Sequence, residues 1–269
     1  MGIVNVTPDS FSGDGVGTDL DTAVSLATTM ESAGADIVDV CGESTRPHST
    51  PVIADEELAR TLPLIEALSR RLTIPISIDT RKAVVAAAAV EAGAAIVNDV
   101  WGLRADAGMA RVVAEHPETA VVVMHNQHGA QYANLMADIT ERLRESIAIA
   151  AEAGIAADRV IVDPGFGFGK TPAQNLEVMR RLRELRSLGR PVLVGPSRKS
   201  TIGMLTDGAQ PGDRLEGSLA LAALAVAGGA HIVRVHDVAQ TLRAVRVADA
   251  VVRGTPDSLL AAPPPGPTG

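Results

Sequence analysis

The chain has 269 residues, of which 46% are apolar and 2% aromatic, and its formal net charge is −8. The length suits one large domain or two small ones, and the acidic balance argues against binding nucleic acid through bulk positive charge. A single cysteine, Cys41, excludes an intrachain disulfide and a cysteine-based zinc site. The sequence has neither a run of about 20 apolar residues nor a signal-peptide pattern, so we expect a soluble cytoplasmic protein that does not enter a membrane.

Short apolar runs alternate with helical patterns along the chain. The runs, each predicted to be a strand, are residues 3–6, 37–40, 74–78, 95–97, 120–124, 159–162, 191–194 and 231–235. Between them, apolar residues at three-to-four spacing predict helices over residues 21–33, 55–71, 82–92, 105–115, 135–153, 172–188, 212–227 and 238–253. Eight strand–helix units of this total length are typical of a (β/α)8 TIM barrel. We therefore predict an α/β TIM barrel in a single domain, residues 1–254, followed by a Pro/Gly-rich tail, residues 255–269, that is disordered at its end.

Nearly every predicted strand ends in a polar residue. Buried polar groups cost free energy unless something satisfies them, so a set of them at the same strand ends indicates a ligand site. A doubly wound open sheet would spread these ends apart, whereas a closed barrel brings them to one mouth. The residues concerned are Asn5, Glu43, Asp79, Asn98, His125, Asp163, Ser197, Arg234 and His236.

The first two strand ends offer oxygen ligands and a cation. The amide oxygen of Asn5 suits Mg²⁺ or a phosphate-bound water, although an ordinary loop with an Asx turn is the alternative. Thr45 and Arg46 supply a hydroxyl donor and a fixed cation for phosphate or carboxylate.

The middle strand ends allow two interpretations each. Asp79 and Asn98 either face a ligand or cap the following helix. An asparagine both donates and accepts hydrogen bonds, so it suits the edge of a heterocycle. Met124 either belongs to the core or packs against a flat ring. His125 is interpreted as a structural histidine.

The segment 163–170 carries the sharpest signal. Asp163 precedes three glycines at every second position, which allow unusual backbone angles and close approach of a ligand. Its carboxylate suits an amidine-like edge, as in a 2-aminopyrimidinone, through paired charge-assisted hydrogen bonds. The alternative is a glycine-rich turn capped by Asp163. The segment lacks the spacing of a Walker motif, which argues against nucleotide hydrolysis.

Cations gather after the last two strands. Lys199 lies about one turn beyond the seventh strand, where its ammonium either crosses the barrel mouth or is solvated. Arg234 and His236 share one face of an extended strand and together suggest a pyrophosphate site. An ion pair inside the barrel is the alternative for Arg234.

Five segments, in order, resemble the motifs of the dihydropteroate synthase family of pterin-binding enzymes: residues 5–12, 42–47, 163–170, 197–200 and 234–237. The resemblance runs from Gly2 to about Val247. It implies a TIM-barrel transferase that joins 6-hydroxymethyl-7,8-dihydropterin pyrophosphate to p-aminobenzoate. The products would be 7,8-dihydropteroate and pyrophosphate, on the route to folate. It also implies a homodimer, small-molecule substrates rather than nucleic acid, and a sulfonamide target.

The resemblance assigns roles to residues at the strand ends. Those implied to bind the pterin are Asp79, Asn98, Met124, Asp163, Gly167, Lys199 and Arg234. Those implied to bind pyrophosphate are Asn5, Thr45, Arg234 and His236, with Mg²⁺ as cofactor held by Asn5. Those implied to line the p-aminobenzoate site are Thr45, Arg46, Pro47, Phe168, Lys199 and Ser200. The catalytic set would be Lys199, Arg234, His236 and Asp79.

The chain departs from the family pattern at several points. Cys41 stands where the family usually has glycine, and Asp14 is the candidate substitute for the usual acid of the first loop. Trp101 and Pro196 are also atypical. The sequence leaves two alternative functions. One is a folate-dependent corrinoid methyltransferase, which would not need the segments 44–47 and 197–200, and the other is a non-catalytic pterin-binding homologue.

Overall fold

The computed structural model describes residues 1–7, 19–43 and 51–254. The strands of this part are β1 (Gly2–Asn5), β2 (Val38–Cys41), β3 (Ile76–Asp79), β4 (Ile96–Asp99), β5 (Ala120–Met124), β6 (Val160–Asp163), β7 (Leu193–Val194) and β8 (Ile232–Val233). The α-helices are α1 (Leu20–Ser32), α2 (Ala54–Ser69), α3 (Ala83–Glu91), α4 (Met109–Glu115), α5 (Leu135–Glu152), α6 (Pro172–Arg180), α7 (Ser200–Leu205), α8 (Leu215–Ala227) and α9 (Val238–Arg253). None of these helices is both long enough and apolar enough to cross a bilayer.

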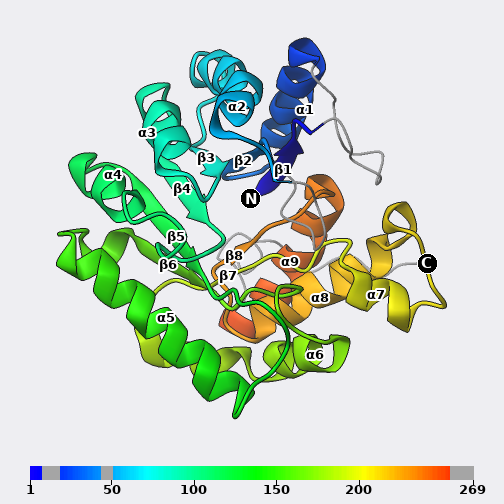
Figure 1. Ribbon diagram of the computed structural model, residues 1–269. Coiled ribbons are helices and arrows are strands. Elements are labelled where there is room, and N and C mark those ends of the chain that lie inside the picture. The colour runs from blue at the N-terminus through cyan, green and yellow to red at the C-terminus, as the bar shows by residue number, and fades with distance from the viewer. Residues whose placement is uncertain (8–18, 44–50, 255–269) are drawn as a thin grey trace, which may run out of the picture.

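The strands form a closed parallel ring, which confirms the predicted TIM barrel. β1 to β6 pair in chain order, and β7 pairs with β8. Single bridges join the two sheets, from Val162 to Val192 and from Gly2 to Val235. The second junction includes the hydrogen bond from Ile3 N to the Val235 oxygen, at 3.0 Å. The helices surround this ring of strands (Figure 1).

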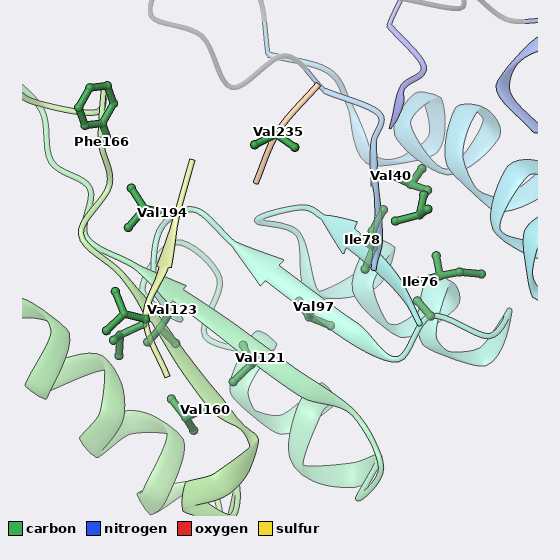
Figure 2. Packing of buried hydrophobic residues seen from close by; sticks show 14 of the residues in the cluster. Val40, Ile76, Ile78, Val97, Val121, Val123, Val160, Phe166, Val194 and Val235 are labelled. Atoms are coloured by element: carbon green, nitrogen blue, oxygen red, sulfur yellow. The ribbon is translucent and has the colours of Figure 1, made fainter. Parts of the chain in front are cut away.

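Residues alternate along the strands between two environments, as the two-residue period of a strand requires. Val38 and Val40 of β2 and Ile78 of β3 belong to a large cluster that includes residues of the surrounding helices. Figure 2 shows part of this outer cluster. The intervening residues face the barrel axis. They are apolar toward the N-terminal strand ends, as Ile96 and Ile161 show, and polar toward the C-terminal ends.

The helix predicted over residues 172–188 is interrupted. α6 begins with a capping box, in which Thr171 and Gln174 bond to each other's backbone, and ends at Arg180. A 3-10 helix, η2 (Leu182–Leu188), follows. Its buried leucines are Leu182, Leu185 and Leu188. They repeat every third residue, which matches the period of a 3-10 helix rather than that of an α-helix.

The short helix α7 was not predicted from the sequence. Two apolar residues in it, Met204 and Leu205, are exposed to 67% and 62%. A helix whose apolar side chains face outward gives no amphipathic signal toward its own core. Two further 3-10 turns lie where predicted elements begin: η1 (Ala157–Arg159) overlaps the start of the strand predicted over residues 159–162, and η3 (Pro211–Asp213) overlaps the start of the helix predicted over residues 212–227.

Candidate active site

Arg234 lies at the centre of a charged cluster inside the barrel. It follows β8, and its Nε donates to Oδ2 of Asp39 at 2.6 Å. Its Nη2 donates to Oδ2 of Asp79 and to Sγ of Cys41, both at 2.9 Å. The interior ion pair considered for Arg234 is therefore present. Because its hydrogen bonds to these three residues use Nε and Nη2, Nη1 is not engaged by them.

This cluster carries more negative than positive charge. Asp39 and Asp79 are buried, and the single guanidinium of Arg234 balances only one of them. Burial raises the pKa of Asp79 to about 7; Arg234 opposes this rise, and the charge of Asp39 adds to it. Within the described part of the chain, Oδ1 of Asp79 and Oδ1 of Asp39 are buried without a hydrogen-bond partner. A buried acceptor without a donor is costly, so these oxygens favour a ligand that brings N–H groups.

Asp79 does not cap α3, which settles the first ambiguity. The backbone N–H of Ala83, at the start of that helix, donates to Oδ2 of Asp106 at 2.8 Å. The N–H of Lys82 donates to Oγ1 of Thr80 at 3.2 Å. Asp106 and Thr80 therefore accept the hydrogen bonds of the backbone N–H groups at the start of α3, and the Asp79 carboxylate faces the barrel interior.

Asn98 and Asp99 have different roles, and neither caps the following helix, α4, whose N-cap residue is Gly108. Asp99 accepts hydrogen bonds from the backbone N–H groups of Trp101 and Leu103, at 2.8 and 2.7 Å, and so fixes the loop after β4. Asn98 lies on the opposite face of the strand. Its Nδ2 is 3.4 Å from Oδ2 of Asp39, so the amide joins the interior cluster.

Asp163 lies at the end of β6 among cations. Its Oδ1 accepts a hydrogen bond from the N–H of Gly165 at 2.6 Å, so the carboxylate does cap the glycine-rich turn. Burial raises the pKa of Asp163 to about 6, and the positive charges of Lys170, Lys199 and Arg234 counteract that rise. Asp163, Lys199 and Arg234 come from different strand ends yet interact electrostatically, as convergence at one mouth requires.

Gly167 gives Lys199 room to cross the loop after β6. Gly167 has φ of +83°, and a Cβ added there would lie 3.0 Å from Cδ of Lys199. Nζ of Lys199 lies 4.2 Å from the centre of the Phe168 ring, a cation–π contact. The N–H of Gly167 donates to Oδ1 of Asn175, which lies in α6, at 2.8 Å. Asn175 was not predicted as a site residue, since a single asparagine within a helix gives no signal in the sequence.

His236 meets the loop after β7. Its Nδ1 is 3.0 Å from Oγ of Ser197, and its backbone N–H donates to the same oxygen at 3.3 Å. Next to this contact, Arg198 forms a two-point ion pair with Asp237, at 2.6 and 3.0 Å. The two segments 197–200 and 234–237 are therefore joined side by side.

The remaining predicted residues are placed at the rim or lie outside the described part. Met124 is buried at the end of β5 and pairs in register with Asp163. Asn5 is half-buried at the end of β1, and Ser200 is exposed at the start of α7. Thr45, Arg46 and Pro47, together with Asp14, lie outside the described residues.

The Asp39, Cys41 and Asp79 group does not suit Mg²⁺, although its ligand atoms lie within 4.8 Å of one another. The guanidinium of Arg234 already occupies the centre of this group. Burial raises the pKa of the Cys41 thiol well above its ordinary value, and Mg²⁺ prefers oxygen ligands. The oxygen of Asn5 has the right chemistry, because Mg²⁺ is commonly held by one or two protein oxygens together with substrate phosphates.

A closed (β/α)8 barrel with buried acids, an amide and cations at its C-terminal mouth defines the protein as a TIM-barrel enzyme. The chain belongs to the family described as pterin binding enzyme, whose model matches residues 1–236.

Close relatives of known name support this assignment. The chain is 46% identical to a dihydropteroate synthase of Clostridium beijerinckii, over 94% of each sequence. It is similar to the crystal structure of dihydropteroate synthase from Clostridium difficile in the presence of pteroic acid, with a TM-score of 0.90 and 49% identity, covering 94% of this chain and 96% of the other. It is also similar to Xanthomonas albilineans dihydropteroate synthase with 4-aminobenzoic acid, with a TM-score of 0.88 and 44% identity, covering 98% and 93%.

Proposed function

We propose that this protein catalyses the dihydropteroate synthase reaction, in which 6-hydroxymethyl-7,8-dihydropterin pyrophosphate and p-aminobenzoate give 7,8-dihydropteroate and pyrophosphate. The main support for this proposal is the group of buried residues around Arg234 at one barrel mouth, namely Asp79, Asn98 and Asp163. Relatives that match nearly the whole chain are named dihydropteroate synthase, and similar structures of that enzyme are described in the presence of pteroic acid and with 4-aminobenzoic acid.

The pterin fits the acidic side of the mouth. Its 2-aminopyrimidinone edge offers N–H donors, and the buried, unpaired Oδ1 of Asp79 and the carboxylate of Asp163 are acceptors. Asn98 would donate and accept at the same edge. Met124 and Lys199 would complete the pocket around the ring, with Gly167 giving the lysine its room.

The pyrophosphate would bind on the cationic side, between Arg234, through Nη1, and His236. Thr45 and Asn5 would add a hydroxyl and an amide oxygen, and Asn5 would also hold Mg²⁺. When bound, Mg²⁺ supplies neutralisation of the charge that develops on the leaving group. Preorganised cations of this kind typically contribute most of the stabilisation of such a transition state.

The reaction would proceed by ionisation. The C–O bond to pyrophosphate breaks and its electron pair leaves with the pyrophosphate, giving a carbocation stabilised by the electron-rich pterin. The arylamine nitrogen then forms the new C–N bond and loses a proton. No enzyme nucleophile is required, which agrees with the burial of the thiol of Cys41, the single cysteine.

The p-aminobenzoate would lie beside the pair formed by Lys199 and Phe168, at the outer edge of the mouth. Phe168 offers an apolar ring face and Lys199 a cation for the carboxylate. We also assign Ser200, Thr45, Arg46 and Pro47 to this side.

Incubation of the protein with both substrates and Mg²⁺ tests the proposal through pyrophosphate release. We expect release only when both substrates and Mg²⁺ are present. Tight pterin binding without release would instead favour a non-catalytic pterin-binding protein. Methyl transfer from methyltetrahydrofolate to cobalamin would favour the corrinoid methyltransferase.

We further propose a cytoplasmic homodimer whose barrel is one domain over residues 1–254. Exposed apolar side chains on neighbouring helices support an interface: Met204 and Leu205 on α7, Leu224 on α8, and Val251 on α9, which is exposed to 81%. α8 and α9 pack closely, and α7 lies beside α8 (Figure 1). Sedimentation at the mass of a monomer would contradict the dimer.

A further inference from the structure

Lys170 ends the loop that follows β6, and its side chain turns back into that loop. Its Nζ donates hydrogen bonds to the backbone oxygens of Gly165 and Phe168, each at 3.0 Å, and lies 3.1 Å from Nδ1 of His125. An ammonium group has three N–H donors and no acceptor. The three acceptors therefore match its full donor set, yet the proposed reaction gives this lysine no role.

His125 acts as an acceptor because its ring is neutral. It is buried directly after β5, and burial lowers the pKa of His125 to about 3, with the charge of Lys170 acting in the same direction. A neutral imidazole has one acceptor nitrogen, and the contact with Lys170 assigns it to Nδ1. The interpretation of His125 as a structural histidine thus gains a specific partner.

The loop needs such a donor because of its backbone. Gly165, Gly167 and Gly169 have φ values of +69°, +83° and +54°, so left-handed residues recur at every second position. Such a backbone cannot continue a helix or a strand, although the N–H of Phe168 closes a turn on the oxygen of Gly165 at 3.1 Å. Further donors to the carbonyl groups of the loop must come from side chains. Lys170 supplies donors to two of these carbonyls.

The carbonyls that Lys170 holds belong to the residues that shape the proposed site. Gly165 donates to the carboxylate of Asp163 at 2.6 Å. Phe168 carries the ring that lies 4.2 Å from the ammonium of Lys199. We propose that Lys170 is a positioning residue, which fixes this loop so that Asp163 meets the pterin while Phe168 and Lys199 face p-aminobenzoate. This inference rests on the proposed function.

Two variants of Lys170 test the proposal. Lys170→Met removes all three donors from a side chain of similar length, and Lys170→Gln keeps two N–H donors on a shorter chain. For Lys170→Met we expect the Kd of 6-hydroxymethylpterin and the KM of p-aminobenzoate to rise about tenfold or more, as the loss of these hydrogen bonds predicts. Lys170→Gln should lie between this variant and the wild type. If Lys170→Met does not fold, the values for Lys170→Gln decide by the same criterion.

Arg159 provides a matched control at the opposite end of β6. It is also a cation that ties loop carbonyls together, since its guanidinium donates to the oxygens of Val113, His116 and Thr119 at 2.7 to 2.8 Å. Arg159→Met should lower the Tm yet change Kd and KM by less than about twofold. The proposal is overturned if Lys170→Met leaves both constants within about twofold of wild type, or if Arg159→Met raises them equally.

Amide hydrogen exchange over residues 163–170 gives a readout that does not need turnover. We expect faster exchange in Lys170→Met and unchanged exchange in Arg159→Met; equal exchange in Lys170→Met and wild type would overturn the proposal. If the wild type neither binds pterin nor releases pyrophosphate, the proposed function fails, and the exchange result still decides the role of Lys170 in the loop.

Discussion

The Arg234 guanidinium contacts the Asp79 carboxylate at 2.9 Å, although the two residues are 155 positions apart in the chain. The contact joins the end of β3 to the end of β8 across the barrel interior. It places the cation assigned to the leaving pyrophosphate next to the acid assigned to the pterin. One guanidinium therefore links the two halves of the proposed substrate.

Arg234→Ala should lower kcat by about 10²–10³, the usual cost of removing one charge-stabilising donor. The substitution also leaves the buried carboxylates of Asp39 and Asp79 without their cation, which typically costs about 3–5 kcal/mol of stability. Because Arg234 opposes the raised pKa of Asp79, its removal favours protonation of Asp79 in the folded state, so the variant should lose stability more steeply than wild type as pH rises. Steady-state kinetics and thermal unfolding at several pH values measure the two effects. Wild-type turnover by a folded variant would refute the role of Arg234.

Lowering the pH should lower kcat/KM for the pterin pyrophosphate substrate. Burial raises the pKa of Asp163 to about 6 and that of Asp79 to about 7, and only the ionised carboxylates are free to accept donors at both oxygens. Since kcat/KM reports the free enzyme, its value for the pterin pyrophosphate should fall as pH drops through this range. A profile that stays flat down to pH about 5 would conflict with these assignments.

Asp79→Asn should alter the pH dependence of stability. The pKa of Asp79 is raised from its ordinary 3.8 to about 7 in the folded protein, so the folded state binds more protons between these values. Its contribution to stability is present below pH 3.8 and is lost as pH rises through 7. The asparagine side chain does not titrate, so the variant does not undergo this loss of stability, which amounts to about 1.4 kcal/mol for each unit by which folding raises the pKa. Its free energy of unfolding, relative to wild type, should therefore rise with pH; parallel curves would contradict the prediction.

Gly165→Ala should distort the loop after β6, residues 163–170, and so weaken pterin binding. A Cβ at this position would lie 2.0 Å from the backbone oxygen of His125, and φ is +69°. Gly154 is the matched control, with φ of +87° and no atom within 4 Å of its Cβ position. Gly154→Ala should cost only the roughly 1–2 kcal/mol of a left-handed alanine. Calorimetric titration with 6-hydroxymethylpterin should show weak or no binding to Gly165→Ala, and equal binding by the two variants would contradict the steric argument.

The strand ends of the site were predictable because their signal is local. Asp79, Asn98 and Asp163 each follow an apolar run of the sequence, and a closed barrel brings such ends together. Asp39 was missed because it lies within an apolar run and its partner Arg234 is 195 residues away. The sequence signal for its role was the presence of this acidic residue inside a predicted strand.

Long-range contacts account for the rest of what the sequence did not reveal. The bond between Lys170 and His125 depends on how two neighbouring loops meet, which no local pattern specifies. The choice of Asp106, rather than Asp79, as the side chain that caps α3 has the same origin. Asn98 and Asp99 are adjacent polar residues at one strand end, and only the packed barrel decides that Asn98 faces the interior while Asp99 fixes the loop after β4.

The ratio of products tests the central claim most directly. With both substrates and Mg²⁺, quantification of dihydropteroate by mass spectrometry alongside pyrophosphate should give equal amounts, because cleavage and condensation occur at one mouth. Pyrophosphate formed without dihydropteroate, or neither product from a protein that binds pterin, would contradict the account.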